Sequence, residues 1–187
     1  DPSLLGPFIA AGWELVREGV KALTTTCGFM ILFQEDLARE LPVPVFTSSL
    51  LQLPFIERTL GPLGRVGVLT ADASNLTAEH LRRAGGDPER ITIAGLEKEP
   101  AFREAIFSGT GRIDPAAIQA EVVRQTERLV TENERIAAIL FECANLPPYA
   151  AAVQKAVGLP VYDFTTMVCH VHAALVRTAF SCRHRNG

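Results

Sequence analysis

Short apolar runs alternate with amphipathic segments along the whole chain. Apolar runs that predict buried strands cover Val20–Thr25, the "LPVPVF" segment that ends at Phe46, "RVGVLT" after Gly64, Ile91–Ala94, Ile136–Phe141 and "GLPVYD". Helical spacing of apolar residues predicts helices over Ser3–Glu18, Phe29–Arg39, 48–60, a segment that begins at Ser74 or Asn75, 115–132, Leu146–Val157 and Thr165–Phe180. Short strands separated by amphipathic helices are typical of βαβ units, so the pattern predicts an α/β fold with parallel sheets.

Local signals mark several boundaries of these elements. Ser3 is a candidate N-cap, Gly19 ends the first helix, and Ser48 or Ser49 begins the third. Asp114 followed by Pro115 begins a long helix, because Asp is a favoured N-cap and Pro is tolerated at the first helical position.

The break "GPLG" at 61–64 predicts a division of the chain into two lobes. The first α/β lobe comprises residues 1–62 and 163–187, and the second comprises 63–162. Two pairs of segments correspond between the lobes: "GVKALTTTCGF" with "RIAAILFECAN", and "ELPVPVFTSS" with "GLPVYDFTT". We therefore expect two pseudo-symmetric lobes, each a parallel sheet flanked by helices.

Composition excludes several classes of protein. The 187 residues carry a net charge of −3, which gives no electrostatic footprint for nucleic acid, and the basic "CRHRNG" end is short enough to be a solvated tail. No apolar run approaches the roughly 20 residues that span a bilayer. The start "DPSLLGPF" lacks the basic and apolar regions of a signal peptide. Four cysteines without a CxxC pair indicate a reducing compartment, so we expect a cytoplasmic protein. Because no membrane span is predicted, we also expect no membrane partner.

Two cysteines stand where chemistry is expected in such a fold. Cys27 and Cys143 each follow an apolar strand and precede a helical segment. Ligands of parallel α/β sheets bind at the carboxyl ends of the strands, and a helix N-terminus lowers the pKa of a thiol and binds carboxylates. Two thiols on opposite walls of a cleft could remove a proton from one face of a carbon acid and return one to the other.

Simpler interpretations apply to each of these features taken alone. A single buried cysteine is usually a small hydrophobe, and "TTT" at 24–26 could reflect strand propensity. Asp72 and Glu142 flank the expected cleft. Glu142 could tune Cys143, or could be a solvated or capping carboxylate. The "CHVH" segment at 169–172 has too few ligands on one helix face for zinc, so we expect no metal.

The chain resembles the aspartate/glutamate racemase superfamily, whose members are cofactor-independent racemases. The resemblance rests on a cysteine after "KALTTT", a second after "AAILFE", "GRVGVLTADAS" at the start of the second half, and "GLPVYD" before a long final helix. It implies that Cys27 and Cys143 are the catalytic acid/base pair and that no cofactor is needed. It also implies that substrate-binding groups lie at Thr26, Gly28, Thr70, Ala144 and Asn145.

This chain departs from the family pattern at three places. Gly28-Phe29 follow the first cysteine where glutamate racemases usually have Asn-Thr, and Ala144-Asn145 follow the second where they usually have Thr-His. These differences argue against glutamate and, less strongly, against aspartate as substrate. The family also begins with a strand before the first helix, so we expect that strand to be missing here and the exposed sheet edge to favour a homodimer.

From these features we expect a racemase or isomerase that acts on a small carboxylate or a related carbon acid. The alternatives are an enzyme similar to arylmalonate decarboxylase or maleate isomerase, and a non-catalytic protein that binds a small ligand.

Overall fold

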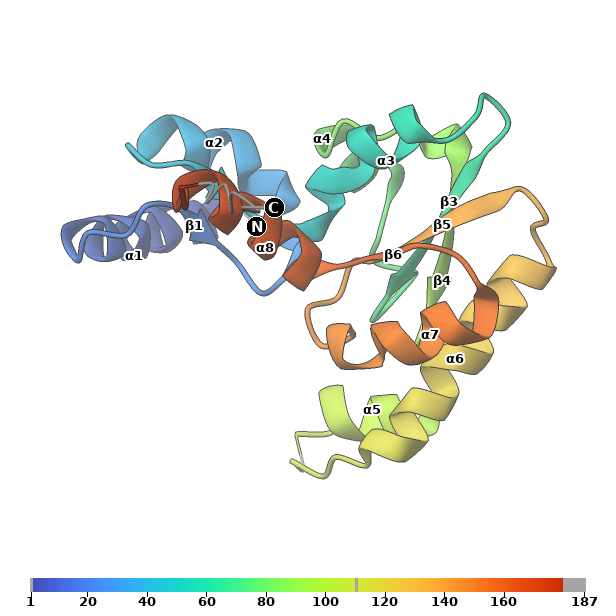
Figure 1. Ribbon diagram of the computed structural model, residues 1–187. Helices are drawn as coiled ribbons and strands as arrows, with labels where there is room; N and C mark the ends of the chain where they lie inside the picture. Colours follow the sequence, from blue (N-terminus) through green and yellow to red (C-terminus); the bar gives the residue numbers. More distant parts are fainter. Residues whose placement is uncertain (1, 110, 180–187) are drawn as a thin grey trace, which may run out of the picture.

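The computed structural model describes residues 2–109 and 111–179, and it has two parallel sheets flanked by helices (Figure 1). The larger sheet has the strand order β4-β3-β5-β6, and all its neighbouring strands are parallel. Its strands are β3 (Arg65–Thr70), β4 (Ile91–Gly95), β5 (Ile136–Phe141) and β6 (Val161–Tyr162). The smaller sheet pairs β1 (Leu23–Thr24) with β2 (Val45–Phe46), also in parallel. The expected α/β fold with parallel sheets flanked by helices is therefore confirmed.

Helices and 3-10 turns connect the strands. The α-helices are α1 (Leu5–Arg17), α2 (Gln34–Glu40), α3 (Leu53–Thr59), α4 (Ala78–Arg83), α5 (Pro100–Ile106), α6 (Pro115–Thr131), α7 (Ala150–Val157) and α8 (Phe164–Leu175). The 3-10 turns are η1 (Pro2–Leu4), η2 (Gly28–Phe33), η3 (Ser49–Gln52), η4 (Pro88–Arg90) and η5 (Pro147–Tyr149).

The larger sheet is covered on both faces because its central strands are apolar on both sides. Val66 and Val68 of β3 pack with α3, α4, η2 and η3, whereas Ile139 and Phe141 of β5 pack with α5, α6 and α7. Figure 1 shows these two helical layers on opposite sides of the sheet. Continuous apolar strands of this kind are typical of parallel sheets buried on both faces.

The smaller sheet has a core of its own. Leu37 and Leu41, from α2 and the segment after it, pack with Met30 and Val45 and with the inner face of α1. Helix α8 leaves β6 and returns to the smaller sheet (Figure 1). The division at residues 62 and 63 remains a prediction; α3, which precedes it in sequence, packs in the core of the larger sheet.

The expected element boundaries hold where strong local signals exist. Strands β3 and β5 have the predicted bounds, Asp114 caps α6 by accepting a hydrogen bond from the Ala117 N–H, and Ser48 caps η3. The first helix instead begins at Leu5, after the short turn η1 that contains Ser3, and it ends at Arg17 before Gly19, whose φ is +88°.

Other boundaries were predicted wrongly. Helix α4 begins after Thr77 rather than at Ser74 or Asn75, because these two side chains bond to Asp72 and form a turn. Helix α5 was not predicted at all. The final helix ends at Leu175, before Phe180, which lies outside the described residues.

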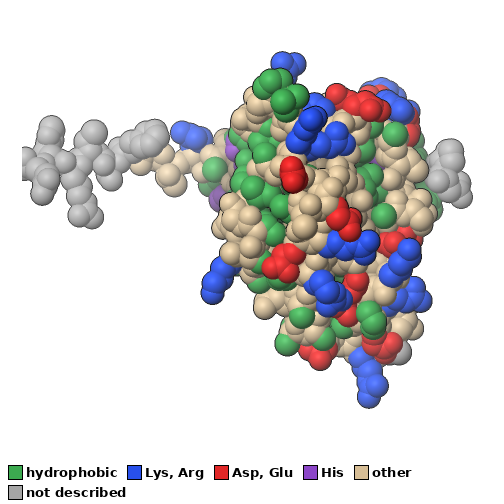
Figure 2. Space-filling model, turned by 90° about the vertical axis from the view of Figure 1, so that its right-hand side faces the viewer, with side chains coloured by type: hydrophobic (Ala, Val, Ile, Leu, Met, Phe, Trp, Pro, Cys, Tyr) green, Lys and Arg blue, Asp and Glu red, His purple; other side chains and the backbone are tan. Residues whose placement is uncertain are grey.

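The face drawn in Figure 2 carries acidic and basic side chains close together, without an extended area of one sign among the residues coloured by type. None of the described helices is both long enough and apolar enough to cross a membrane.

Candidate active site

The structure brings the loops of Cys27 and Cys143 together at the carboxyl ends of β1 and β5. Cys27 is exposed and is the N-cap residue of η2. Cys143 is 8% exposed and lies two residues beyond β5. A turn closed by the hydrogen bond from Leu146 N–H to the Cys143 carbonyl separates it from η5. A helical turn therefore follows Cys27 directly, and after Cys143 the helical segment begins at Pro147, one residue later than the predicted start at Leu146.

The contact between the two loops is made by Gly28 and Glu142. A Cβ atom on Gly28 would lie 1.9 Å from Glu142 Oε1 and 2.6 Å from its Cδ. Only a residue without a side chain allows this approach of the Cys27 loop to the residue that precedes Cys143. The thiols are also close enough for a charge on Cys27 to raise the pKa of Cys143.

Glu142 is enclosed rather than solvated. Its side chain is 3% exposed, and its Oε2 accepts a hydrogen bond of 2.7 Å from the Thr70 hydroxyl at the end of β3. Burial raises the pKa of this carboxyl, and the bond from Thr70 opposes that effect. The enclosed position therefore shifts this carboxyl toward its protonated form relative to a solvated glutamate.

The environment of Cys143 disfavours the thiolate. Burial raises the pKa of this thiol to about 11, and a negative charge on Glu142 or Cys27 acts in the same direction. Asn145 opposes the shift through its backbone N–H and through its side-chain Nδ2, which lies 3.7 Å from Cys143 Sγ. These N–H groups are the donors that would hold a thiolate once it forms.

The five predicted substrate-binding residues lie in different environments. Thr26 and Asn145 are exposed beside the two cysteines, and Ala144 is half-buried. Gly28 is buried against Glu142, and Thr70 is fully buried with its hydroxyl engaged by the same carboxyl. The contact of these five residues with a substrate, and the catalytic role of the two thiols, remain predictions.

Sequence reasoning missed a residue that ties η3 to the Cys143 loop. Ser49 is 1% exposed, and its hydroxyl donates to the Phe141 carbonyl at 2.7 Å and lies 3.3 Å from the Glu142 carbonyl. The signal in the sequence was the hydroxyl-rich "FTSS" segment, which we had interpreted only as a helix start.

A second set of polar contacts fixes the Cys27 loop to β2. The Thr25 hydroxyl donates to the Thr47 carbonyl and lies 3.3 Å from the Cys27 carbonyl. Gln34 Oε1 in turn accepts hydrogen bonds from the Thr47 N–H and hydroxyl. Through the Thr25 hydroxyl, these bonds tie the Cys27 loop to Thr47, the residue after β2.

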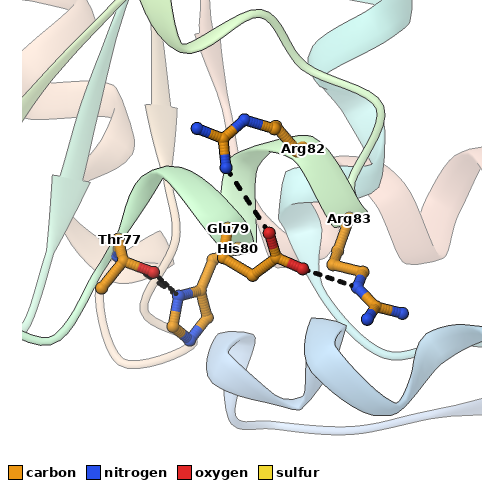
Figure 3. Close-up of polar contacts among 5 residues, drawn as sticks. All are labelled: Thr77, Glu79, His80, Arg82 and Arg83. Carbon is orange, nitrogen blue, oxygen red and sulfur yellow. Dashed lines mark hydrogen bonds and ion pairs between the residues drawn. The ribbon is translucent and has the colours of Figure 1, made fainter.

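Helix α4 supports the outer side of η2. Figure 3 shows the Thr77 hydroxyl beside the ring of His80, and Glu79 between Arg82 and Arg83. The His80 ring packs edge-on against Phe29, with centroids 5.5 Å apart, and Arg83 forms an ion pair with Glu35 at the start of α2. Burial lowers the pKa of His80, so a neutral imidazole is favoured in this contact.

Two apolar grooves lie away from the thiols. One of about 320 Å³ is lined by β1 and α8 and includes His172, and an adjoining one of about 560 Å³ lies between β6, α3 and α8 and includes His170. Cys169 is exposed on α8. Within residues 2–109 and 111–179, no three metal-ligating side chains come together.

Comparison with known proteins gives a family and a set of close relatives. The pattern described as Asp/Glu/Hydantoin racemase matches residues 10–174. Dimethylsulfoniopropionate lyase 7 of Emiliania huxleyi (strain CCMP1516) is 37% identical over 179 residues, which cover 90% of this chain and 52% of the relative. A dimethylsulfoniopropionate lyase of Durusdinium sp. clade D is 33% identical over 152 residues, 79% of this chain and 50% of the relative. The chain thus spans about half the length of the curated relatives it matches.

Solved structures show the same fold at low sequence identity. Allantoin racemase from Pseudomonas fluorescens superposes with a TM-score of 0.61 at 22% identity, over 84% of this chain and 62% of that protein. Unliganded arylmalonate decarboxylase superposes with a TM-score of 0.63 at 17% identity, over 95% of this chain and 78% of that one.

These findings confirm the superfamily and correct the expected activity. The expectation of a racemase or isomerase is wrong, because the curated relatives that match most of the chain are lyases. The alternatives were a decarboxylase, a maleate isomerase and a binding protein, and none of these is a dimethylsulfoniopropionate lyase. The contexts of Cys27 and Cys143 predict where a proton is removed but do not determine what happens after its removal.

Proposed function

This chain belongs to the Asp/Glu/Hydantoin racemase family, and we propose that it acts as a lyase that eliminates dimethyl sulfide from dimethylsulfoniopropionate. The observation that carries the proposal is 37% identity to a dimethylsulfoniopropionate lyase across 90% of the chain, a span that includes both cysteine loops. The chain spans about half the length of these relatives, so the activity of the whole protein is part of the proposal.

The elimination needs one base. The base removes a proton from the carbon beside the carboxylate, and the electron pair of that C–H bond becomes the second bond between this carbon and its neighbour. The bond from that neighbour to sulfur breaks, and sulfur keeps the electron pair. The products are acrylate, neutral dimethyl sulfide and a proton on the base, so charge and electrons balance without a second acid.

We assign the base to Cys143. Asn145 offers two N–H groups to its sulfur, and no corresponding donors are found at Cys27 within the described part of the chain. A thiolate in a poorly hydrated position is a strong base. A cationic substrate favours its formation, because a nearby positive charge counteracts the burial and the acidic groups that raise the pKa of Cys143. Cys27, at the facing loop, forms the opposite wall of the site.

The carboxylate of the substrate needs hydrogen-bond donors beside this base. Thr26 and Asn145 are exposed next to the two cysteines and are the side chains we assign to this end of the substrate. Donors at the carboxylate also stabilise the negative charge that develops on it as the proton leaves.

The experiment is release of dimethyl sulfide from dimethylsulfoniopropionate, measured by headspace gas chromatography together with acrylate by NMR. We expect equimolar products from the parent protein. Cys143→Ser should lower kcat by at least about 10²-fold, the usual contribution of a general base. Cys169→Ser, which removes an exposed thiol on α8, should retain activity. Failure of the parent protein to release dimethyl sulfide, or a fully active Cys143→Ser variant, would contradict the proposal.

A further inference from the structure

Glu142 differs from the other buried glutamates in its partners. The glutamates that are at most 8% exposed are Glu57, Glu99, Glu121 and Glu142. Glu121 accepts two backbone N–H bonds at the start of α5, Glu99 pairs with Arg124, and Glu57 accepts the Asp87 N–H. Among the residues that the structure describes, Glu142 has the Thr70 hydroxyl as its side-chain hydrogen-bond partner and forms no ion pair.

A carboxylate with so little compensation is costly inside a protein. Removing a charge from water is strongly unfavourable unless an opposite charge or several hydrogen bonds replace the hydration. Burial accordingly raises the pKa of Glu142 and shifts this carboxyl toward the neutral acid. A cation that entered the site would reverse this preference, because an opposite charge nearby favours the ionised carboxyl.

The position of Glu142 places this carboxyl where a ligand of the thiols would lie. Its Oε1 abuts Gly28, the residue after Cys27, and its own backbone leads into Cys143. Its charge acts on Cys143, since it raises the pKa of that thiol. The two thiols and this carboxyl can all become anions. Within the described chain, no Lys or Arg forms a hydrogen bond or ion pair with any of their side chains.

We propose that Glu142 is a specificity residue that supplies the opposite charge to a cationic group at the β carbon of the substrate. This inference rests on the proposed function, in which that group is the sulfonium. A sulfonium has no N–H or O–H and forms no conventional hydrogen bonds, so a protein must recognise it by charge and shape. A buried carboxylate does this without requiring hydrogen-bond geometry, and its effect is strengthened by the low polarity around it.

The test compares two unreactive ligands of the same shape. In 3-(trimethylammonio)propanoate the group at the β carbon is a cation, and in 4,4-dimethylpentanoate a neutral carbon replaces the nitrogen. Both retain the carboxylate, so the ratio of their dissociation constants, measured by titration calorimetry, isolates recognition of the positive charge. We expect the parent protein to bind the cation at least about tenfold more tightly, a modest value for a charge pair in a buried setting.

Three variants decide the role of Glu142. Glu142→Gln keeps the shape and a hydrogen-bonding group for Thr70, and it should bring the ratio close to one. Glu142→Asp keeps the charge and should keep a preference for the cation. Glu57→Gln is the matched control, because it neutralises a buried glutamate whose pKa is also raised by burial but which bonds to Asp87. It should leave the ratio unchanged.

The outcomes separate this inference from the proposed function. Equal binding of the two ligands by the parent protein, or an unchanged preference in Glu142→Gln, overturns the inference even if dimethyl sulfide is released. A preference for the cation that disappears in Glu142→Gln supports it even if the parent protein releases no dimethyl sulfide, in which case the proposed reaction alone is wrong.

Discussion

The contact between Gly28 and Glu142 makes Gly28→Ala a sharp test of how the two thiol loops are held. The added methyl group would lie 1.9 Å from Glu142 Oε1, and this distance must grow by about 1.1 Å to reach 3.0 Å, below which real Cβ contacts are essentially absent. Gly28 does not have a positive φ, so the perturbation is steric and not a matter of backbone strain.

The strain can be relieved in two ways, and both are costly. If the Glu142 carboxyl turns away, it loses the Thr70 hydroxyl while still buried, which costs about 1–3 kcal/mol. If the loop moves instead, the wall formed by Cys27 shifts by about 1 Å relative to the base Cys143, and a misplacement of the substrate by that distance can lower the rate ~10²-fold. We expect a free energy of unfolding lower by about 1–3 kcal/mol, as is usual for an overpacked core. We also expect kcat/KM to fall by at least about 30-fold, a somewhat smaller loss than full misplacement.

The assays are urea unfolding and release of dimethyl sulfide, with Gly86→Ala as the control. A Cβ atom on Gly86 would lie 2.9 Å from Leu53 Cδ1, so this variant also crowds a buried glycine but leaves the thiol loops alone. It should lose stability and keep activity. In the double variant Gly28→Ala/Glu142→Ala the carboxyl no longer obstructs the methyl group, so the stability loss caused by Gly28→Ala should be smaller than in the parent protein, and the two effects should not be additive. Parental stability and activity in Gly28→Ala, or strict additivity in the double variant, would refute the reasoning.

Three further predictions concern protons, thiols and a helix cap. Because the pKa of Glu142 is raised in the folded protein, this group stabilises the fold fully below pH 4.5, and the stabilisation is lost as the pH rises through the folded-state pKa. The free energy of unfolding of Glu142→Gln, measured in urea, should therefore increase relative to that of the parent protein as the pH rises above 4.5. A difference between the two proteins that does not change with pH would contradict this. Iodoacetamide at pH 7.5 should modify the exposed thiols of Cys27 and Cys169 before the buried thiol of Cys143. The rate at which Cys143 is modified should keep rising as the pH approaches 11, and mass spectrometry of peptides measures the order of modification. Asp163→Ala removes the buried N-cap of α8 and should cost about 1–2 kcal/mol of unfolding free energy, whereas no loss would show that the cap is dispensable.

The fold was predictable wherever a local signal and the tertiary structure agree. Strands β3 and β5 are continuous apolar runs because they are buried on both faces, and helix α6 carries its cap in Asp114 and Pro115. The predicted strand over Val20–Thr25 shrinks to Leu23–Thr24, because its partner β2 is only two residues long. Strand length depends on the partner, which a pattern within one segment does not report.

The candidate site was predictable in its thiols and not in what surrounds them. Strand and helix alternation led to Cys27 and Cys143. The enclosed state of Glu142 depends on Gly28 and Thr70, which belong to two other segments of the chain, so the sequence left a solvated carboxylate open. The short helix α5 was missed for a related reason: it has only seven residues, and the burial of Phe102 among α6 and the larger sheet stabilises it more than its own propensity.

The difference between a racemase and a lyase lies in what happens after the same first step. Racemisation and elimination both begin when a base removes a proton beside a carboxylate. A racemase then needs an acid on the opposite face, whereas a substrate with a cationic sulfur on the next carbon loses that sulfur as a neutral molecule and needs none. The two thiols here are unequal: Cys143 is 8% exposed with Asn145 beside its sulfur, and Cys27 is exposed. Such inequality fits a reaction with one base, and the nearby buried carboxyl fits the charge of the group that leaves.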